Sequence, residues 1–182
     1  FDMETDPPMI TRTIAKYSVN REPDFLYYED EVPFDFTDFT SVMNSMMFSF
    51  SLTGDSQGRF YYSPSSSETY EVFAFNRDGS ELFHIIRDIP RVGKTAPEME
   101  DEIVYIESWA NRIGAQGFVI EWEPDTYRTF VKALGVDNEE HLWVVRGTEH
   151  EPIFDVYDMS GVLLFSARLP VESASWKFHI DS

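Results

Sequence analysis

Four histidines are the side chains in this sequence that could most directly serve acid–base or metal chemistry. They are His84, His141, His150 and His179. None of them stands at a metal-ligand spacing, such as two ligands on one face of a helix. His84 shares the phase of the polar positions in an expected strand, His141 ends a turn, and His150 lies in an acidic loop. We therefore expect surface or strand histidines rather than metal ligands.

Carboxylates are far more numerous than histidines, and because they are so numerous they do not identify an active site. The chain has 33 Asp and Glu residues against 14 Lys and Arg residues. Neighbouring carboxylates are therefore common, and nothing selects the two that a hydrolase with a pair of catalytic acids would need. The sequence also has no Gly-x-Ser-x-Gly elbow, no glycine-rich phosphate loop and no cysteine. It predicts no catalytic and no cofactor-binding residue, and it leaves metal binding open.

The net charge of -19 restricts the partners that the chain can attract. Such a field repels nucleic acid and anionic membranes, so both are excluded as partners. Cations, basic protein surfaces and concentrated salt remain attractive, and a well-solvated or salt-adapted surface is the simplest interpretation of the acidity. No run of 18 apolar residues occurs, so we expect no membrane-spanning segment.

Acidic and aromatic residues are mixed in one stretch, REPDFLYYEDEVPFDFTDF, which covers residues 21–39 of an expected linker over residues 21–47. This composition could provide a cation site or a carbohydrate-stacking surface. The alternative that we prefer is a connecting strand with its acids in solvent and its aromatic rings in the core. The spacing does not match a calcium loop of the EF-hand kind, which places oxygen ligands at alternating positions around a glycine.

One pattern of expected strands and turns occurs twice in the chain, and it would position most of the residues considered above. The segments 48–89 and 130–171 align without a gap at an offset of 82, as Phe75 and Tyr157 illustrate. Each copy reads as four short strands joined by tight turns, with glycines at Gly79 and Gly161 that can take positive φ without strain. Within the first copy, Ser63–Thr69 is expected to be an exposed loop tip. Repetition of such a unit favours propeller blades over a β-sandwich.

Residues 91–129 separate the two copies and are expected to form a helical insertion. Thr95 is a suitable N-cap and Gly114 a suitable end for one amphipathic helix. Its apolar stripe consists of Met99, Ile103, Ile106, Ala110 and Ile113. The helix would cover an end of the sheet core, or else act as a lid or a docking element. A short strand is expected at residues 118–122.

The ends of the chain match parts of the same repeat. Phe1-Asp2-Met3 matches Tyr157-Asp158-Met159, and the segment 178–181 matches 134–137. We therefore interpret the chain as a single partial domain over residues 1–182. Residues 1–20 would end one blade, 48–90 and 130–171 would each form a blade, and 172–182 would begin the next.

This pattern resembles bacterial six-bladed β-propeller proteins of the NHL-like and TolB-like kind. The resemblance is carried by YEVFAFNRDGSELFHIIRDIP at residues 70–90, PEMEDEIVYIESWANRIG at 97–114, ALGVDNEEHLWVVRG at 133–147 and FDVYDMSGVLLFSARLP at 154–170. His141-Leu142-Trp143-Val144 follows Asp137 as in the family's opening pattern, with Glu140 in place of the usual glycine. The resemblance implies an all-β fold of four-stranded antiparallel blades, part of a six-bladed ring, with one inserted amphipathic helix.

The resemblance also frames the expected function. Many such proteins are secreted, periplasmic or surface-anchored and have no assigned activity, which implies a non-enzymatic, extracytoplasmic scaffold that binds a protein partner or a surface glycan without a cofactor. The alternative is a calcium-dependent hydrolase or lactonase, whose relatives hold Ca²⁺ with acidic and amide ligands around the central channel. No residue of this chain matches those ligands one by one. About three blades cannot close a six-bladed ring, so further copies or segments are expected to complete it.

Overall fold

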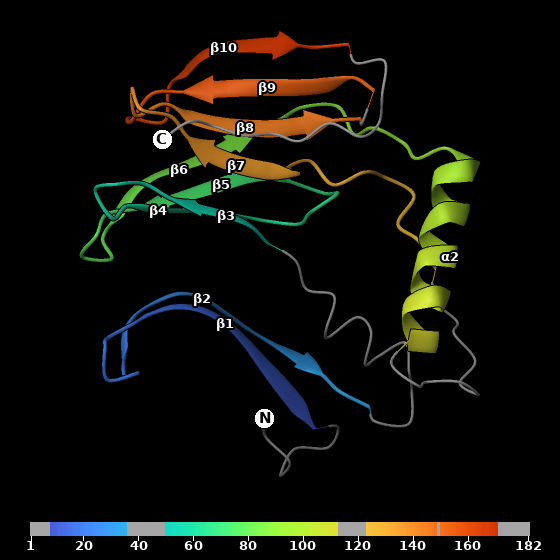
Figure 1. Ribbon diagram of the computed structural model, residues 1–182, viewed down its shortest axis with the longest axis horizontal. Helices are drawn as coiled ribbons and strands as arrows, with labels where there is room; N and C mark the ends of the chain where they lie inside the picture. The colour runs from blue at the N-terminus through green and yellow to red at the C-terminus, as the bar shows by residue number, and fades with distance from the viewer. Residues whose placement is uncertain (1–7, 36–49, 113–122, 149, 171–182) are drawn as a thin grey trace. The chain divides into compact units, whose positions relative to one another are not determined.

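The computed structural model describes residues 8–35, 50–112, 123–148 and 150–170. These residues form ten β-strands and one α-helix, and every strand pairing among them is antiparallel (Figure 1). The expected all-β class is confirmed. The chain divides into two compact units, one with residues 1–48 and 95–126 and the other with residues 49–94 and 127–182.

The first unit contains a hairpin of β1 (Met9–Tyr17) and β2 (Pro23–Pro33). Its turn is closed by a hydrogen bond from Ser18 N to Glu22 O of 2.8 Å. The acidic and aromatic stretch forms a strand over Pro23–Pro33, as expected, and its partner is the strand directly before it. That pairing is not among the sequence-based expectations. Its rings Phe25, Tyr27 and Tyr28 are only partly buried and lie outside the core cluster, which differs from the expected burial in the core. The assignment of residues 1–20 to the end of a blade stays a prediction.

The first unit also contains the helix α2 (Ala96–Arg112), which begins where the sequence predicts. Glu98 reaches back to Thr95, whose backbone N and Oγ1 both donate to Glu98 Oε2 at 2.8 Å. Such a bond satisfies a donor that a helix start would otherwise leave open. Of the predicted stripe, Ile106 and Ala110 are buried, whereas Ile103 is exposed. Ile113, Gly114 and the strand expected at 118–122 lie outside the described residues.

The second unit consists of two four-stranded antiparallel sheets, each running in chain order (Figure 1). The first sheet contains β3 (Phe50–Gly54), β4 (Phe60–Pro64), β5 (Tyr70–Phe75) and β6 (Glu81–Arg87). The second sheet contains β7 (Ala133–Val136), β8 (Leu142–Gly147), β9 (Pro152–Tyr157) and β10 (Leu163–Arg168). The strands of both sheets lie in the segments where the sequence predicts them.

The two sheets share their register as well as their strand order. Ala74 pairs with Phe83 in the first sheet, and Val156 pairs with Phe165 in the second, 82 residues later in each case. A register shift follows at the equivalent place in both sheets, between β5 and β6 and between β9 and β10. The same local sequence signals therefore produce the same backbone twice, down to the bulge.

The sheets pack against each other, with the first strands β3 and β7 next to one another. Successive side chains of a strand point to opposite faces, so each sheet has one face in this contact and one away from it. The inner face of the first sheet carries Tyr61, Val72 and Ile85, and that of the second carries Leu142, Val144 and Tyr157; all belong to one core cluster. We call the opposite faces the outer faces, which carry Tyr62, Phe73 and His84 on the first sheet and Trp143, Phe154 and Phe165 on the second.

The loop Ser63–Thr69 differs from the exposed tip that the sequence predicts. Ser63 ends up in β4 with 1% of its surface exposed, and Ser67 is also buried. The Ser66 carbonyl accepts a hydrogen bond of 2.8 Å from Phe130 N, at the start of the second copy. This contact holds the loop against the second copy, a long-range pairing that a polar composition does not reveal.

Candidate functional site

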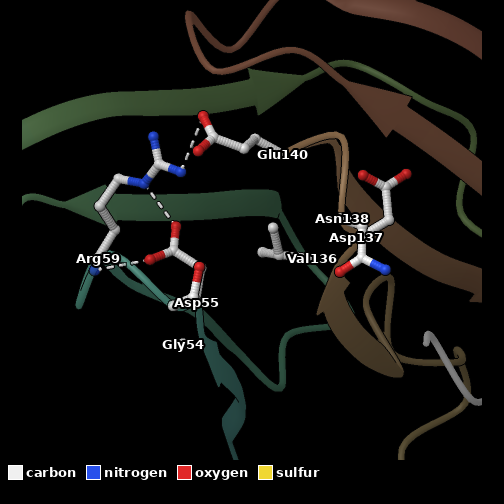
Figure 2. A pocket seen from close by; sticks show the side chains of 8 residues that line it. Gly54, Asp55, Arg59, Val136, Asp137, Asn138 and Glu140 are labelled. Atoms are coloured by element: carbon white, nitrogen blue, oxygen red, sulfur yellow. Dashed lines mark hydrogen bonds and ion pairs between the residues drawn. The ribbon is translucent and has the colours of Figure 1, made fainter. Parts of the chain in front are cut away.

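A pocket of about 460 Å³ lies where the first turns of the two sheets approach each other (Figure 2). It is lined by residues 54–56 and 59 of the first sheet and by residues 136–138 and 140 of the second. Each turn contributes the aspartate that follows its first strand, Asp55 and Asp137. These two residues are equivalent in the repeat, being 82 positions apart.

Asp55 is held by its own hairpin. Its Oδ1 accepts from Gln57 N at 2.9 Å and from Arg59 N at 3.0 Å, while Oδ2 accepts from Arg59 Nε at 2.5 Å and from Tyr61 Oη at 3.1 Å. Burial alone would raise the pKa of this carboxyl, but the hydrogen bonds from Arg59 and Tyr61 outweigh it and hold the pKa below its ordinary value. Asp55 is therefore an ionised acceptor that fixes the turn.

Asp137 repeats this arrangement with different donors. Its Oδ1 accepts from Glu139 N at 2.9 Å and His141 N at 2.8 Å, and its Oδ2 lies 2.8 Å from Trp143 Nε1 and 3.1 Å from His141 Nδ1. Burial raises the pKa of the Asp137 carboxyl, and the bonds from Trp143 and His141 more than reverse that effect. Both aspartates thus use their lone pairs within their own turns.

Glu140 connects the two turns. It has a φ of 65°, in the left-handed region, whereas the equivalent residue of the first sheet is Gly58 with a φ of 80°. A side chain at such a φ costs on the order of 1 kcal/mol. Its carboxylate accepts a hydrogen bond from Gln57 Nε2 and lies 3.3 Å from Arg59 Nη2, as Figure 2 shows for the arginine. The residue that replaces a glycine therefore makes an inter-sheet contact that glycine could not make.

Asp55 and Asp137 are bonded within their own turns, and Glu140 joins the two turns. The pocket is therefore better described as a junction between the sheets than as an open ligand site. Within residues 8–35, 50–112, 123–148 and 150–170, no group of three or more His, Asp or Glu side chains is arranged to hold a metal ion. The calcium-dependent alternative, whose expected ligands include amides as well as acids, stays a prediction.

The histidines occupy separate places. His84 is an exposed residue of β6 whose ring stacks on Phe73, with 4.1 Å between centroids. His141 bonds to Asp137 in the pocket turn, and His150 is exposed. His179 lies outside the described residues. The structure brings no two of the three described histidines together.

One acid of the acidic and aromatic stretch is paired with an arginine of the neighbouring strand. Arg12 Nε donates to Asp30 Oδ1 at 2.8 Å across the β1–β2 hairpin, and the guanidinium lowers the pKa of the Asp30 carboxyl. Phe25 and Tyr27 are in ring contact at 4.9 Å. Residues 36–39 of the stretch lie outside the described part of the chain.

A buried ionic cluster between the sheets was missed by the sequence reasoning. Asp155, with 0% exposure, accepts from Arg146 Nε at 2.6 Å and Ser166 Oγ at 2.5 Å, and its Oδ2 lies 2.9 Å from Arg87 Nη1 of the first sheet. Burial would raise the pKa of Asp155, but Arg146, Ser166 and Arg87 together hold it below its ordinary value. The available signal was an aspartate inside the apolar run PIFDVY, where the first copy has Phe73.

Two tyrosine hydroxyls extend this cluster across the interface. Tyr70 Oη and Tyr157 Oη lie 2.8 Å apart, and Arg87 Nη1 donates to Tyr157 Oη at 3.2 Å. Burial raises the pKa of both hydroxyls, so both stay neutral. No buried side-chain atom of this cluster lacks a hydrogen-bond partner, so the cluster joins the two inner faces without an unsatisfied polar group.

The outer edge of the second sheet is different, because its apolar side chains are exposed. All six residues of β10 are exposed, with Leu164 at 47% and Phe165 at 49%, and Leu169 directly after the strand is at 53%. In the first sheet the equivalent strand β6 buries Ile85, and the Phe83 ring packs on Gly161 of the second sheet. The same strand is thus covered in one sheet and open in the other.

In comparison with known proteins, no family model, no curated protein and no solved structure matches this chain. Among the described residues, α2 is not long and apolar enough to cross a membrane, and no other helix occurs there.

Proposed function

We propose that this chain is a protein-binding module built of propeller-like blades, and that it binds a polypeptide through the outer face and edge of its second sheet. The observation that carries this proposal is the exposure of Leu164, Phe165 and Leu169 along β10. The blades would belong to an extracytoplasmic, six-bladed ring, as the resemblance to bacterial six-bladed propellers implies.

The chemistry of this surface favours a polypeptide over a glycan. Val162, Leu163, Leu164, Phe165 and Leu169 are all large exposed apolar residues. Contiguous exposed apolar residues are typical of protein interaction sites, whereas single ones are normal on any surface. A carbohydrate-stacking site combines an aromatic ring with hydrogen-bonding groups, but aliphatic side chains predominate here. Covering them removes apolar surface from water, at about 25 cal/mol per Å².

The position of β10 adds a second argument. It pairs only with β9 in the described sheet, so it is the edge strand of that sheet. Edge strands are ready templates for contact with another chain, and proteins commonly protect them with charges or prolines. β10 has a single charged residue, Arg168, at its last position. Its composition is that of a strand that another protein covers.

Site-specific photocrosslinking in the cells that produce the protein tests this proposal. A benzophenone amino acid would replace Phe165 and, in a control variant, Val19, which is a fully exposed apolar residue of the β1–β2 turn. We expect polypeptide adducts at position 165 and none above background at position 19. Equal labelling at both positions, or labelling of carbohydrate only, would overturn the proposal. The peptide composition of an adduct also reveals what the partner is.

A further inference from the structure

Building on the proposed function, we propose that the partner adds an extended segment to β10 as a further strand of the second sheet. This segment is apolar in its middle and cationic at both ends. Extended peptides bind to open sheet edges in this way, with main-chain hydrogen bonds supplying affinity and alternate side chains supplying specificity. The inference rests on a row of outward-facing backbone groups on β10, with the acidic residues Asp158 and Glu151 at its two ends.

The register of β10 shows which of its backbone groups face outward. Leu169 N donates to Pro152 O at 3.0 Å, so the backbone groups of Leu169 point toward β9. Directly opposite residues in an antiparallel pair alternate between hydrogen-bonded and non-hydrogen-bonded pairs. Counting back from Leu169, the pairings of Arg168 and Ser166 with β9 are of the non-hydrogen-bonded kind. Ser166 and Arg168 therefore direct their N–H and C=O groups away from β9, toward the edge.

This edge is open in the described part of the chain. There β10 pairs only with β9, and all six of its residues are exposed (Figure 1). The outermost strand of the first sheet, β6, differs because it buries Ile85 in the core cluster, whereas the equivalent residue of β10 is the exposed Ala167. Of these two strands, β10 is therefore the one with both faces accessible next to an added strand.

The side chains of β10 determine the middle of the added segment. Residues opposite each other on neighbouring strands place their side chains on the same face of the sheet. Phe165 and Ala167 lie on the outer face, so an added strand should place apolar side chains opposite them. Ser166 and Arg168 lie on the other face, where a small polar side chain suits the serine and avoids a second cation beside the arginine. Alternating Val and Thr meet both requirements and favour the strand conformation.

The charges around β10 determine the ends of the segment. Asp158 opens the turn that leads into β10, and Glu151 lies beside the last residue of the strand, with its Oε2 at 3.7 Å from Arg168 Nη1. The Glu151 side chain is 59% exposed, so water screens this ion pair and the carboxylate can also attract a cation of the partner. The net charge of -19 adds a long-range attraction for cationic ends.

Synthetic peptides test the inference by fluorescence anisotropy with the full chain. The probe is a labelled peptide that alternates Val and Thr between a pair of lysines at each end, and its match has glutamates in place of the lysines. We expect the lysine peptide to bind, and to bind more weakly as salt is added, because salt screens its ends. The glutamate peptide should bind at least about tenfold more weakly, since the net charge of the chain repels it.

Two variants at one position separate the backbone from the side chain. Arg168→Pro removes an outward N–H, a change that edge strands tolerate, whereas Arg168→Ala removes the same side chain and keeps the N–H. Ile86→Pro is the matched control, because Ile86 is the equivalent residue of β6 and is 64% exposed. Arg168→Pro should bind the lysine peptide about tenfold or more weakly than Arg168→Ala, and Ile86→Pro should bind it as the wild type does. Circular dichroism and thermal unfolding verify that each variant is folded.

N-methylated peptides test the same hydrogen bonds without a change in the protein. Residues of the added strand opposite Ser166 and Arg168 must direct their N–H groups toward β10, and in the proposed arrangement these residues are the threonines. Methylation of the threonine nitrogens should therefore weaken binding by about tenfold or more, whereas methylation of the valine nitrogens should leave it within about threefold of the parent peptide.

Three results would overturn the inference. They are a wild type that does not bind the lysine peptide, equal binding by Arg168→Pro and Arg168→Ala, and equal binding of the two methylated peptides. Any of them together with a polypeptide adduct at position 165 would overturn strand addition and leave the proposed function standing.

Discussion

Phe83 of β6 and Gly161 of the turn before β10 meet where the two sheets pack. A Cβ atom on Gly161 would lie 3.0 Å from Cγ of the Phe83 ring, closer than side-chain atoms normally approach. Gly161 also has a φ of 78°, which favours glycine. The turn glycine thus has two roles, because it closes the β9–β10 hairpin and it admits the phenylalanine of the neighbouring sheet.

Gly161→Ala should therefore destabilise the protein more than the same change in a turn without this contact. Gly58→Ala is the matched control, since Gly58 has a φ of 80° and its nearest neighbour is the flexible Arg77 side chain, at 3.3 Å. Backbone strain accounts for about 1 kcal/mol in both variants, and displacement of the Phe83 ring adds about 1 kcal/mol or more to the first. Urea denaturation measures the difference. An equal decrease in the free energy of unfolding of the two variants would show that the contact with the Phe83 ring adds no cost.

Removing the charge of Asp155 should have a large effect on stability. Asp155→Asn leaves Arg87 and Arg146 close together without their shared carboxylate, and breaking a buried ion pair typically costs about 3–5 kcal/mol. Asp30→Asn is the control, because the Asp30 side chain is 28% exposed and its pair is screened by water, so a loss of about 1 kcal/mol or less is expected. Thermal unfolding of both variants tests this ranking. A larger loss of stability in Asp30→Asn than in Asp155→Asn would contradict the prediction.

The stability that Asp155 contributes should depend on pH in a defined direction. Its pKa is lowered in the folded state, because Arg146, Ser166 and Arg87 outweigh the effect of burial. In the unfolded chain the pKa of an aspartate is about 3.9. The contribution is therefore fully present above about pH 4 and is lost as the pH falls through the lower folded value. The difference in the free energy of unfolding between wild type and Asp155→Asn should narrow below about pH 4, and a difference that widens would contradict this.

Glu140 allows backbone strain and side-chain contact to be measured separately. Glu140→Gly and Glu140→Ala both remove the carboxylate next to Arg59, but only glycine takes the φ of 65° without strain. The glycine variant should be more stable than the alanine variant by about 1 kcal/mol. The Glu140 side chain is 42% exposed, so its ion pair should contribute no more than about 1 kcal/mol. Equal stability of the two variants would indicate that the turn relaxes to a different backbone.

Local signals in the sequence predict much of the second unit. Gly79 and Gly161 mark hairpin turns because a positive φ is needed there, and both have it. The offset of 82 predicts which strands are equivalent, since one strand pattern produces one register. Thr95 and Glu98 predict the start of α2 because their contact is local in the chain.

Contacts between distant segments could not be predicted in this way. Asp155 and Arg87 come from different copies, and no local pattern shows that their strands face each other. The pairing of β1 with β2 was missed because the repeat led to a blade interpretation of residues 1–20. The open face at Phe165 could not be foreseen either, because its sequence equivalent, Phe83, is partly buried against the core cluster. Exposure depends on which sheet comes next in space, and that is a tertiary property.

Hydroxyl-radical footprinting of the purified protein tests the central claim most directly, because it reports the solvent exposure of single side chains. For the protein alone we predict fast labelling of Phe165 and Leu169 and slow labelling of Phe83 and Ile85. When the polypeptide captured by crosslinking at position 165 is added, the labelling of Phe165 and Leu169 should fall towards that of Phe83, while Val19 stays as reactive as before. Labelling of Phe165 and Leu169 that the added polypeptide does not change would contradict the account that this strand binds a polypeptide.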